Sequence, residues 1–189
     1  MKKVLLFASG TGSNVENIIH YFANTAEVTI NGIFTNNPNA KVLAIAKTHN
    51  VPALIFTKTE LNEGHVLRKI NELQPDLIVL AGFLWKFPEH IIAKYPNKII
   101  NIHPALLPKY GGKGMYGMNV HNSILENKDK ETGITIHYVN EQYDEGEFIL
   151  QQKVNIEMCK TSEEIAIKVQ KLEHAFLPKA IEKLLISNF

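Results

Sequence analysis

The sequence predicts an α/β fold: a doubly wound, mainly parallel sheet with an antiparallel C-terminal strand pair and a long C-terminal helix. Three observations predict it. Over about the first hundred residues, short apolar runs alternate with amphipathic segments, the order typical of a parallel sheet with helices on both faces. Two later apolar runs have only a loop between them. A capping box then opens the last amphipathic segment.

Each element of the first half follows from the period of its apolar residues. Val15, Ile18 and Phe22 recur with helical spacing, whereas residues 76–81 form a nearly continuous apolar run, as in a strand buried on both faces. Pro88 suits the first turn of a helix. The expected order is strand 4–8, helix 14–23, strand 28–34, helix 41–49, strand 53–56, helix 63–73, strand 76–81, helix 88–94 and strand 98–102.

The second half departs from this order. Residues 132–139 and 148–154 are predicted strands without a helix between them, which favours antiparallel pairing at one end of the sheet. Thr161 and Glu164 form a capping box, which predicts a helix from there to about residue 185. Residues 109–118 contain four glycines and are predicted to be a mobile lid. No repeat or linker divides the sequence, so a single domain over residues 1–189 is expected.

The charge balance excludes some classes of partner. Lysine and arginine number 20 against 19 acidic residues, so the net charge of +1 provides no field for nucleic acid or an anionic membrane. Arg68 is the only arginine, and a phosphate site must therefore use backbone N–H groups, hydroxyls and lysine. The lone Cys159 has no internal disulfide partner, which favours a reducing, cytoplasmic location. No apolar stretch is long enough to cross a bilayer.

A glycine-rich turn, residues 9–14 (Ser-Gly-Thr-Gly-Ser-Asn), joins the first expected strand to the first helix. Ligands of doubly wound sheets bind at this edge, where N–H groups of the helix start and the Ser13 hydroxyl can hold an anion. Val15 replaces the third glycine of the dinucleotide pattern, and no Gly-Lys-Ser/Thr follows as in a Walker A loop. The turn therefore predicts a phosphate cradle for a mononucleotide. The alternative is a tight turn in which Ser13 or Asn14 caps the helix.

Asn101 and His103 lie two residues apart on the strand before Pro104, so both side chains are expected on the same side. Burying such groups without partners costs roughly 1–3 kcal/mol each, so a buried strand should not carry them without a reason. An amide stabilises a developing oxyanion and an imidazole shuttles a proton near neutral pH, which an acyl-type transfer requires. The alternative is an asparagine and a histidine with purely structural hydrogen bonds.

The remaining acidic and imidazole groups give weaker signals. Asp144 lies in the loop between the late strands and is either a turn residue or an acid that raises the pKa of His103. The other histidines show no metal-ligand spacing, so no metal site is expected. A substrate contact by His121 is not favoured, and His137 is expected to be structural. The other histidines are His20, His49, His65, His90, His121, His137 and His174.

These motifs resemble one family, the folate-dependent phosphoribosylglycinamide formyltransferases of purine synthesis, over nearly the whole chain. The most specific stretch is Asn101-Ile102-His103-Pro104-Ala105-Leu106-Leu107-Pro108 with the later Asp144. The matching segments are residues 9–14, 80–83, 101–109, 133–137, 144–146 and 173–174.

The resemblance implies transfer of the formyl group of 10-formyltetrahydrofolate, a cosubstrate, to the amine of glycinamide ribonucleotide, without a metal. Asn101 and protonated His103 would stabilise the oxyanion, and Asp144 would support that protonation. Residues 1–100 would form a nucleotide-binding half and residues 101–189 a catalytic and folate-binding half, in a monomer or homodimer. The implied substrate ligands are Gly12, Ser13, Asn14 and Glu173, and the implied folate ligands are Leu84, Trp85, Lys86, Phe87, Asn101, Asn140, Glu141 and Asp144.

The chain departs from the family pattern at two places. Trp85 stands where many relatives carry arginine, so Lys58 or Lys86 is expected near the glutamate tail of folate. The lid at residues 111–118 differs from the commoner Pro-Gly-Leu form. The resemblance also implies a cis peptide between Leu107 and Pro108, which an X–Pro bond permits at little cost.

Three other functions compete with this interpretation. A formyltetrahydrofolate hydrolase would use Asn101, His103 and Asp144 on water, but usually carries an additional N-terminal domain. A transfer-RNA formyltransferase would need a basic C-terminal domain. A non-catalytic nucleotide-binding module would keep residues 10–14 but would not need the other three residues together.

Overall fold

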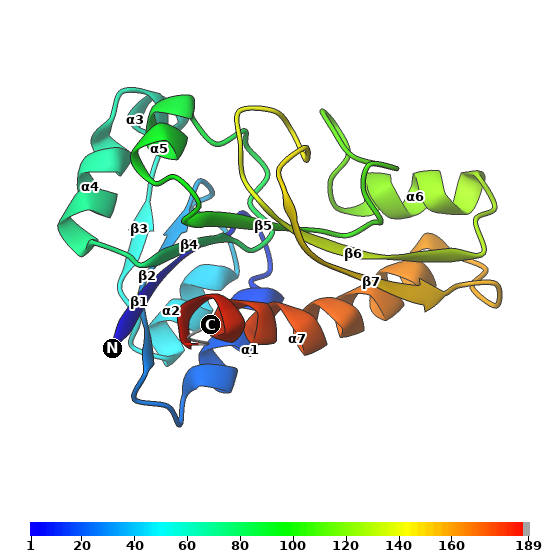
Figure 1. The fold of residues 1–189 in the computed structure, drawn as a ribbon, viewed down its shortest axis with the longest axis horizontal. Helices are drawn as coiled ribbons and strands as arrows, with labels where there is room; N and C mark the ends of the chain where they lie inside the picture. The colour runs from blue at the N-terminus through cyan, green and yellow to red at the C-terminus, as the bar shows by residue number, and fades with distance from the viewer. Residues whose placement is uncertain (187–189) are drawn as a thin grey trace.

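The sheet confirms the predicted architecture. The computed structural model describes residues 1–186, and within them seven strands form one sheet in the order β3-β2-β1-β4-β5-β6-β7 (Figure 1). Strands β1 to β5 pair in parallel, whereas β6 is antiparallel to both β5 and β7. The strands are β1 (Lys2–Phe7), β2 (Val28–Thr35), β3 (Ala53–Ile55), β4 (Leu77–Leu80), β5 (Ile99–His103), β6 (Glu131–Tyr138) and β7 (Phe148–Asn155).

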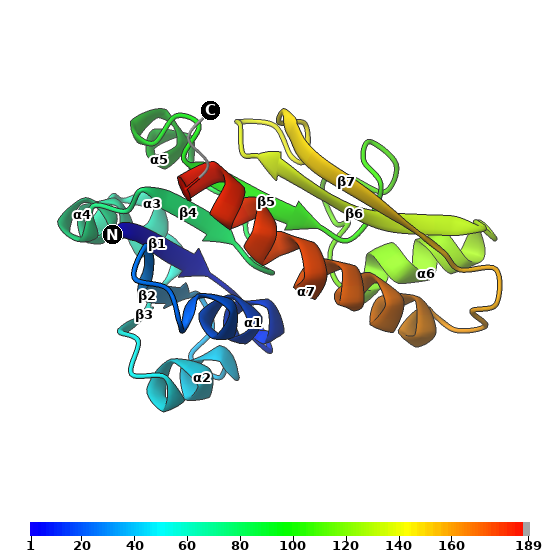
Figure 2. The same ribbon diagram turned by 60° about the horizontal axis from the view of Figure 1, so that its bottom comes forward.

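Alternate side chains of the central strands build two cores, one on each face of the sheet. On β1, Leu5 and Phe7 belong to one core and Val4 and Leu6 to the other, and all four are fully buried. Helices α3, α4 and α5 cover the Phe7 side, and α1, α2, α6 and α7 contribute to the opposite core (Figure 2). The helices are α1 (Ser13–Phe22), α2 (Val42–Thr48), α3 (Lys58–Asn62), α4 (His65–Leu73), α5 (Glu89–Lys94), α6 (Met118–Glu126) and α7 (Ser162–Ile186).

Two of these helices were not predicted. Helix α3 has only five residues, but its capping box is present in the sequence: Thr57 Oγ1 accepts from the Glu60 N–H, and the Glu60 carboxylate accepts from the Thr57 N–H. Helix α6 begins directly after Gly117, within the glycine-rich stretch, so no polar N-cap residue marks its start. The other elements lie within two residues of their predicted bounds.

Helix α7 is the last element of the described chain and contacts the first helix, α1. Its capping box is confirmed, since the Glu164 N–H donates to Thr161 Oγ1 at 3.2 Å. The helix runs along the sheet and packs against both α1 and α6 (Figure 2). Residues 187–189 of the predicted domain lie outside the described residues. Among the helices of residues 1–186, none is both long and apolar enough to span a membrane.

Candidate functional site

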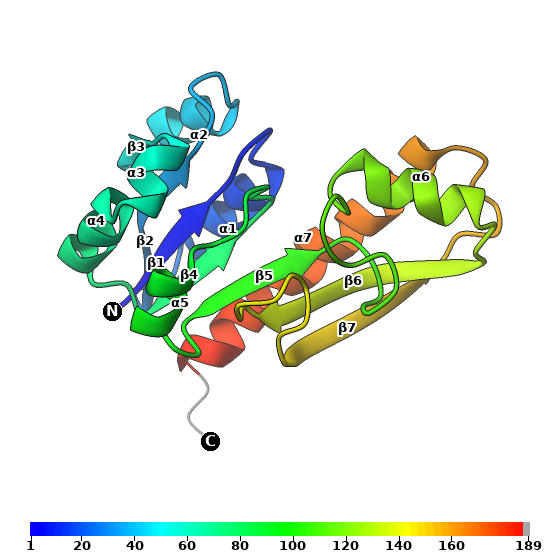
Figure 3. The ribbon, with the colours of Figure 1, turned by 90° about the horizontal axis from the view of Figure 1, so that it is seen from above.

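A cavity of about 940 Å³ lies where β1, β4 and β5 end. These strands run in the same direction, so their carboxyl ends meet at one edge of the sheet (Figure 3). The glycine-rich turn after β1, the segment after β4 and the end of β5 all line the cavity. The fold therefore brings together motifs that lie far apart in the sequence. The lining also includes residues 112–118, 142–144 and part of α7.

Asn101 and His103 both face this cavity, as predicted from their spacing on β5. His103 is only 3% exposed, and its Nε2–H donates to the Tyr110 carbonyl at 2.8 Å. Asn101 is partly buried, and its Nδ2 lies 3.2 Å from Nε2 of His137. The intervening Ile102 belongs to the hydrophobic core. Both polar side chains therefore have specific partners, and one amide hydrogen of Asn101 remains for another acceptor.

Asp144 lies beside these groups, although it follows β5 by about forty residues. Its Oδ2 is 3.6 Å from Nδ1 of His103, and its Oδ1 is 3.6 Å from Nε2 of His137. The Gly112 N–H, in the predicted lid, donates to Oδ2 at 2.9 Å. Asp144 has a φ of 57°, a left-handed conformation that non-glycine residues rarely adopt. Asp144 is therefore more than a turn residue, because its carboxylate contacts two imidazoles and the lid.

The charges of His103 and Asp144 depend on burial and on each other. Burial lowers the pKa of His103, and the opposing effects of Asp144 and the Tyr110 carbonyl do not compensate. The expectation that Asp144 raises the His103 pKa is correct for that one interaction, although burial makes the net pKa lower than usual. The protonated His103 implied for the reaction stays a prediction. For Asp144, burial acts to raise the pKa, but the two imidazoles and the Gly112 N–H together lower it. A carboxylate beside a neutral imidazole is the favoured state at neutral pH.

His137, which was expected to be structural, also lies in this cluster. Its Nδ1 faces the Tyr138 carbonyl at 2.9 Å, and because a carbonyl only accepts, Nδ1 carries the proton. Nε2 is then free to accept from Nδ2 of Asn101. The pairing of β5 with β6 sets Asn101 directly opposite His137. No local spacing links the two residues, so only a correct prediction of this antiparallel register finds His137.

His121 is a second imidazole that the sequence did not favour as a substrate contact. It lies on α6, is 6% exposed and lines the cavity. Burial lowers its pKa, and the nearby His103 lowers it further. Within residues 1–186, its Nδ1 has no hydrogen-bond partner. A buried polar atom at a cavity wall is suited to bind a ligand group.

The start of α1 lies in the same cavity as these groups. Gly12 is the N-cap residue, with a left-handed φ of 79°, so the predicted alternative of a Ser13 or Asn14 cap is wrong. Nδ2 of Asn14 instead donates to the Glu173 carboxylate at 3.0 Å, and Nε2 of Gln170 donates to the Ser13 hydroxyl at 3.1 Å. Burial raises the pKa of Glu173, and the Asn14 bond offsets this only in part. The four predicted substrate ligands are therefore close together.

The residues after β4 form another wall of the cavity. Leu84, Trp85 and Lys86 line it, as does Lys58 from α3. The Trp85 ring lies edge-on to Phe83, with centroids 6.3 Å apart. Phe87 also lines the cavity, but it is only 3% exposed and mainly a core residue.

The loop after β6 places some of the predicted folate ligands at the cavity. Asn140 lines the cavity, but Glu141 is exposed and is not among the described lining residues, whereas Gln142 and Tyr143 are. The Gln142 N–H donates to Oδ1 of Asn140 at 3.0 Å, a turn that brings Gln142 to the cavity side. The predicted cis peptide between Leu107 and Pro108 is confirmed. The mobility of the lid stays a prediction.

The fold and the site define an α/β enzyme whose polar groups meet at the carboxyl ends of a parallel sheet. The Formyl transferase family matches residues 2–181, and the chain belongs to this family.

Relatives and solved structures of this family resemble the chain over most of its length. It is 35% identical over 183 residues to "Phosphoribosylglycinamide formyltransferase, chloroplastic" of Arabidopsis thaliana, covering 92% of this chain but only 62% of that relative. It is 34% identical over 184 residues to the Escherichia coli K12 phosphoribosylglycinamide formyltransferase, covering 94% and 84% of the two chains. The crystal structure of phosphoribosylglycinamide formyltransferase from Bacillus halodurans gives a TM-score of 0.88 at 34% identity, covering 98% of this chain and 96% of that chain.

Proposed function

We propose that the protein transfers the formyl group of 10-formyltetrahydrofolate to the amine of glycinamide ribonucleotide. The observation that carries this proposal is the convergence of Asn101, His103 and Asp144 in the cavity that also contains the start of α1. A nucleotide-binding module needs the helix start but not an amide, an imidazole and a carboxylate in contact. The names of the relatives described above support the same activity.

The substrate phosphate binds at the start of α1 in this proposal. Gly12, Ser13 and Asn14 offer N–H groups at the positive end of the helix dipole, which suits an anion in a chain with a single arginine. Glu173 contacts the ribose, since its carboxylate is held at this point by Asn14. The folate binds against residues 84–87 and the loop after β6, on the other side of the catalytic groups.

The reaction then follows from the geometry of the polar cluster. The glycinamide amine attacks the formyl carbon, a C–N bond forms, and the carbonyl electrons move to the formyl oxygen. The remaining amide hydrogen of Asn101 stabilises this oxyanion, and His137 fixes the orientation of that amide. Collapse of the intermediate breaks the bond from the formyl carbon to N10 of the folate. The amine loses one proton and N10 gains one.

His103 and Asp144 move this proton. Nε2 of His103 is bound to the Tyr110 carbonyl, so the attacking amine's proton is accepted at Nδ1, beside the Asp144 carboxylate. The imidazolium forms only during the reaction, because burial keeps the pKa of His103 low in the free protein. Its charge and the adjacent carboxylate therefore stabilise the transition state more than the ground state.

One assay distinguishes this function from its alternatives. The protein is mixed with glycinamide ribonucleotide and 10-formyltetrahydrofolate, and release of the deformylated folate is followed. The expected release depends on the ribonucleotide. Release without the ribonucleotide would indicate a hydrolase, and no release in either mixture would indicate a binding module.

A further inference from the structure

A cluster of metal-ligating side chains lies outside the cavity, on the surface formed by α1 and α2. Glu16 and His20 are four residues apart on α1 and therefore share one face of that helix. His49 is the C-cap residue directly after α2. One carboxylate oxygen of Glu16 and one ring nitrogen of each histidine lie within 4.8 Å of one another. Local spacing predicted no metal site because the third side chain comes from a different helix.

The geometry of the three side chains is close to that of a metal site. Nε2 of His49 lies 4.0 Å from Oε1 of Glu16, and the rings of His20 and His49 meet edge-on with centroids 5.0 Å apart. Tetrahedral zinc with bonds of about 2.0–2.2 Å places its ligand atoms roughly 3.4 Å apart. Side-chain rotations that bring the atoms closer by up to about 1.4 Å are sufficient. His20 is exposed, and Glu16 and His49 are only partly buried, so such rotations are free of core packing.

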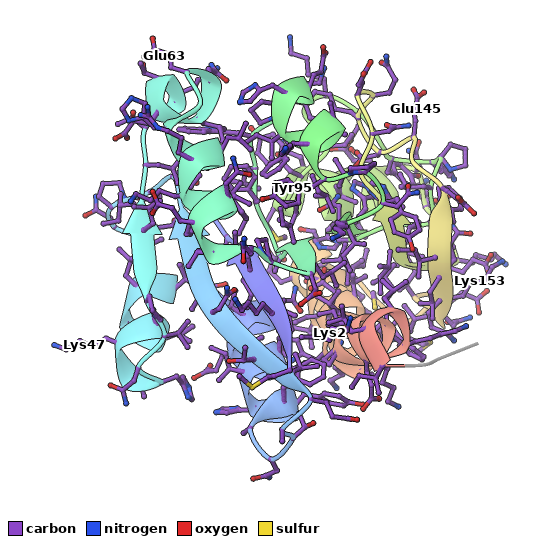
Figure 4. The ribbon with its side chains drawn as sticks, turned by 60° about the vertical axis from the view of Figure 1, so that its left-hand side comes forward. Lys2, Lys47, Glu63, Tyr95, Glu145 and Lys153 are labelled. Atoms are coloured by element: carbon purple, nitrogen blue, oxygen red, sulfur yellow. The ribbon has the colours of Figure 1, made fainter. Side chains whose placement is uncertain are left out.

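We propose that Glu16, His20 and His49 bind a divalent transition metal ion such as zinc. Two imidazoles and one carboxylate suit zinc, nickel or copper, whereas magnesium and calcium prefer sites made only of oxygen. The fourth position of a tetrahedral site is left to water. Lys47, also on α2, points away from the protein, so its ammonium group does not occupy the cluster (Figure 4).

Binding at this site links α1 to α2, and the other end of α2 packs against the start of α1. Val42 and Ile45 of α2 lie against Gly12, because a Cβ added at Gly12 would be 2.7 Å from Val42 and 2.9 Å from Ile45. A metal ion held by both helices binds only the folded state, so it raises the melting temperature by an amount that grows with the logarithm of its concentration relative to Kd. The three side chains are not among the described lining residues of the cavity, so the site is separate from the catalytic groups.

The test uses the untagged full-length protein after removal of bound metal with a chelator. Zinc chloride is titrated by calorimetry, and cobalt(II) replaces zinc for visible absorption spectroscopy. One equivalent of zinc is expected to bind and to raise the melting temperature. His20→Ala and His49→Ala should each weaken zinc binding by roughly tenfold or more, since even residues behind the ligands typically contribute that much. The cobalt spectrum should weaken in the same two variants.

Two control variants locate the ion. His65→Ala removes an exposed histidine of α4 and should leave zinc binding unchanged. His103→Ala removes an imidazole of the catalytic cavity and should also bind zinc normally. Loss of zinc binding in His103→Ala but not in His20→Ala would place the ion in the cavity and overturn the proposal. Unchanged zinc binding in both His20→Ala and His49→Ala would also overturn it. His49→Gln, of similar size, replaces His49→Ala if the latter lowers the melting temperature of the metal-free protein.

Discussion

Asp144 contacts His103 from the tip of the loop between β6 and β7, with 3.6 Å between Oδ2 and Nδ1. The same loop presents Glu145, the next residue, away from the protein (Figure 4). The turn therefore separates two adjacent carboxylates into one that faces the imidazoles and one that faces solvent. This pair provides a matched test of the role of Asp144.

Asp144→Asn should reduce kcat by about a hundredfold or more, because the amide cannot stabilise the imidazolium that forms at His103. Glu145→Gln removes the same charge from an exposed position and should retain nearly all activity. Ribonucleotide-dependent release of deformylated folate measures both variants. Equal rates for the two variants would contradict the assignment of Asp144.

His103→Ala should reduce turnover by about a thousandfold, because the proton of the amine then has no acceptor at Nδ1. Folding should change little in comparison, and circular dichroism melts check this point. His65→Ala, which removes an exposed histidine outside the cavity, serves as the control. Turnover of His103→Ala within a few-fold of that of the unmodified protein would remove His103 from the mechanism.

The stability of the protein should fall in mild acid in a way that depends on His103. Its folded-state pKa is below the ordinary value of about 6.5, so the unfolded chain takes up this proton first as the pH falls. Stability from this group is therefore complete above about pH 6.5 and decreases as the pH falls toward the folded-state value. Urea unfolding at about pH 7.5 and pH 5.5 should show a smaller loss of unfolding free energy for His103→Ala. A loss of equal size in both proteins would show that the folded-state pKa of His103 is not depressed.

Substitutions of His137 should separate its effect on Asn101 from its effect on packing. His137→Gln keeps a side-chain acceptor for the Asn101 amide, whereas His137→Phe keeps only the bulk of the ring. Turnover should therefore be lower for the Phe variant than for the Gln variant, by roughly tenfold, the value of one lost hydrogen bond to a buried group. Melting temperatures measured in parallel show whether either variant is unfolded. Higher turnover of the Phe variant than of the Gln variant would contradict the role of His137 in orienting the Asn101 amide.

Substitution by alanine should have different effects at Gly10 and at Gly12, which both lie in the glycine-rich turn after β1. At Gly12 the φ of +79° disfavours a side chain, and the new Cβ would be 2.7 Å from Val42. At Gly10 nothing lies within 4 Å of the added atom. Gly12→Ala should lower the unfolding free energy by about 1–3 kcal/mol and raise the KM for the ribonucleotide, whereas Gly10→Ala should remain near normal in stability. Chemical unfolding and steady-state kinetics measure the two effects.

Much of this architecture could be predicted from local patterns, and the exceptions have physical reasons. Strands β1 to β5 follow from apolar runs, and Asn101 and His103 from their spacing on β5. His137 could not be assigned, because its partners depend on the register between β5 and β6. The same holds for Glu16, His20 and His49, whose proximity depends on how two helices pack. A prediction of the His103 pKa also requires the burial of the ring, which cannot be read from the pattern of residues.

The bond between Asn14 and Glu173 joins residues that are 159 positions apart. A ribosome therefore completes the sheet, including the strand that carries Asn101 and His103, and the core on the Phe7 side before it has made the helix that contributes Glu173. The opposite core still lacks the residues of α7 at that point. The nascent chain has its polar cluster early but lacks the Glu173 wall of the cavity until synthesis is nearly finished. A protein that is cleaved before residue 173 would lack this wall and the α7 part of the core opposite Phe7. Under the proposed function, it would bind glycinamide ribonucleotide poorly.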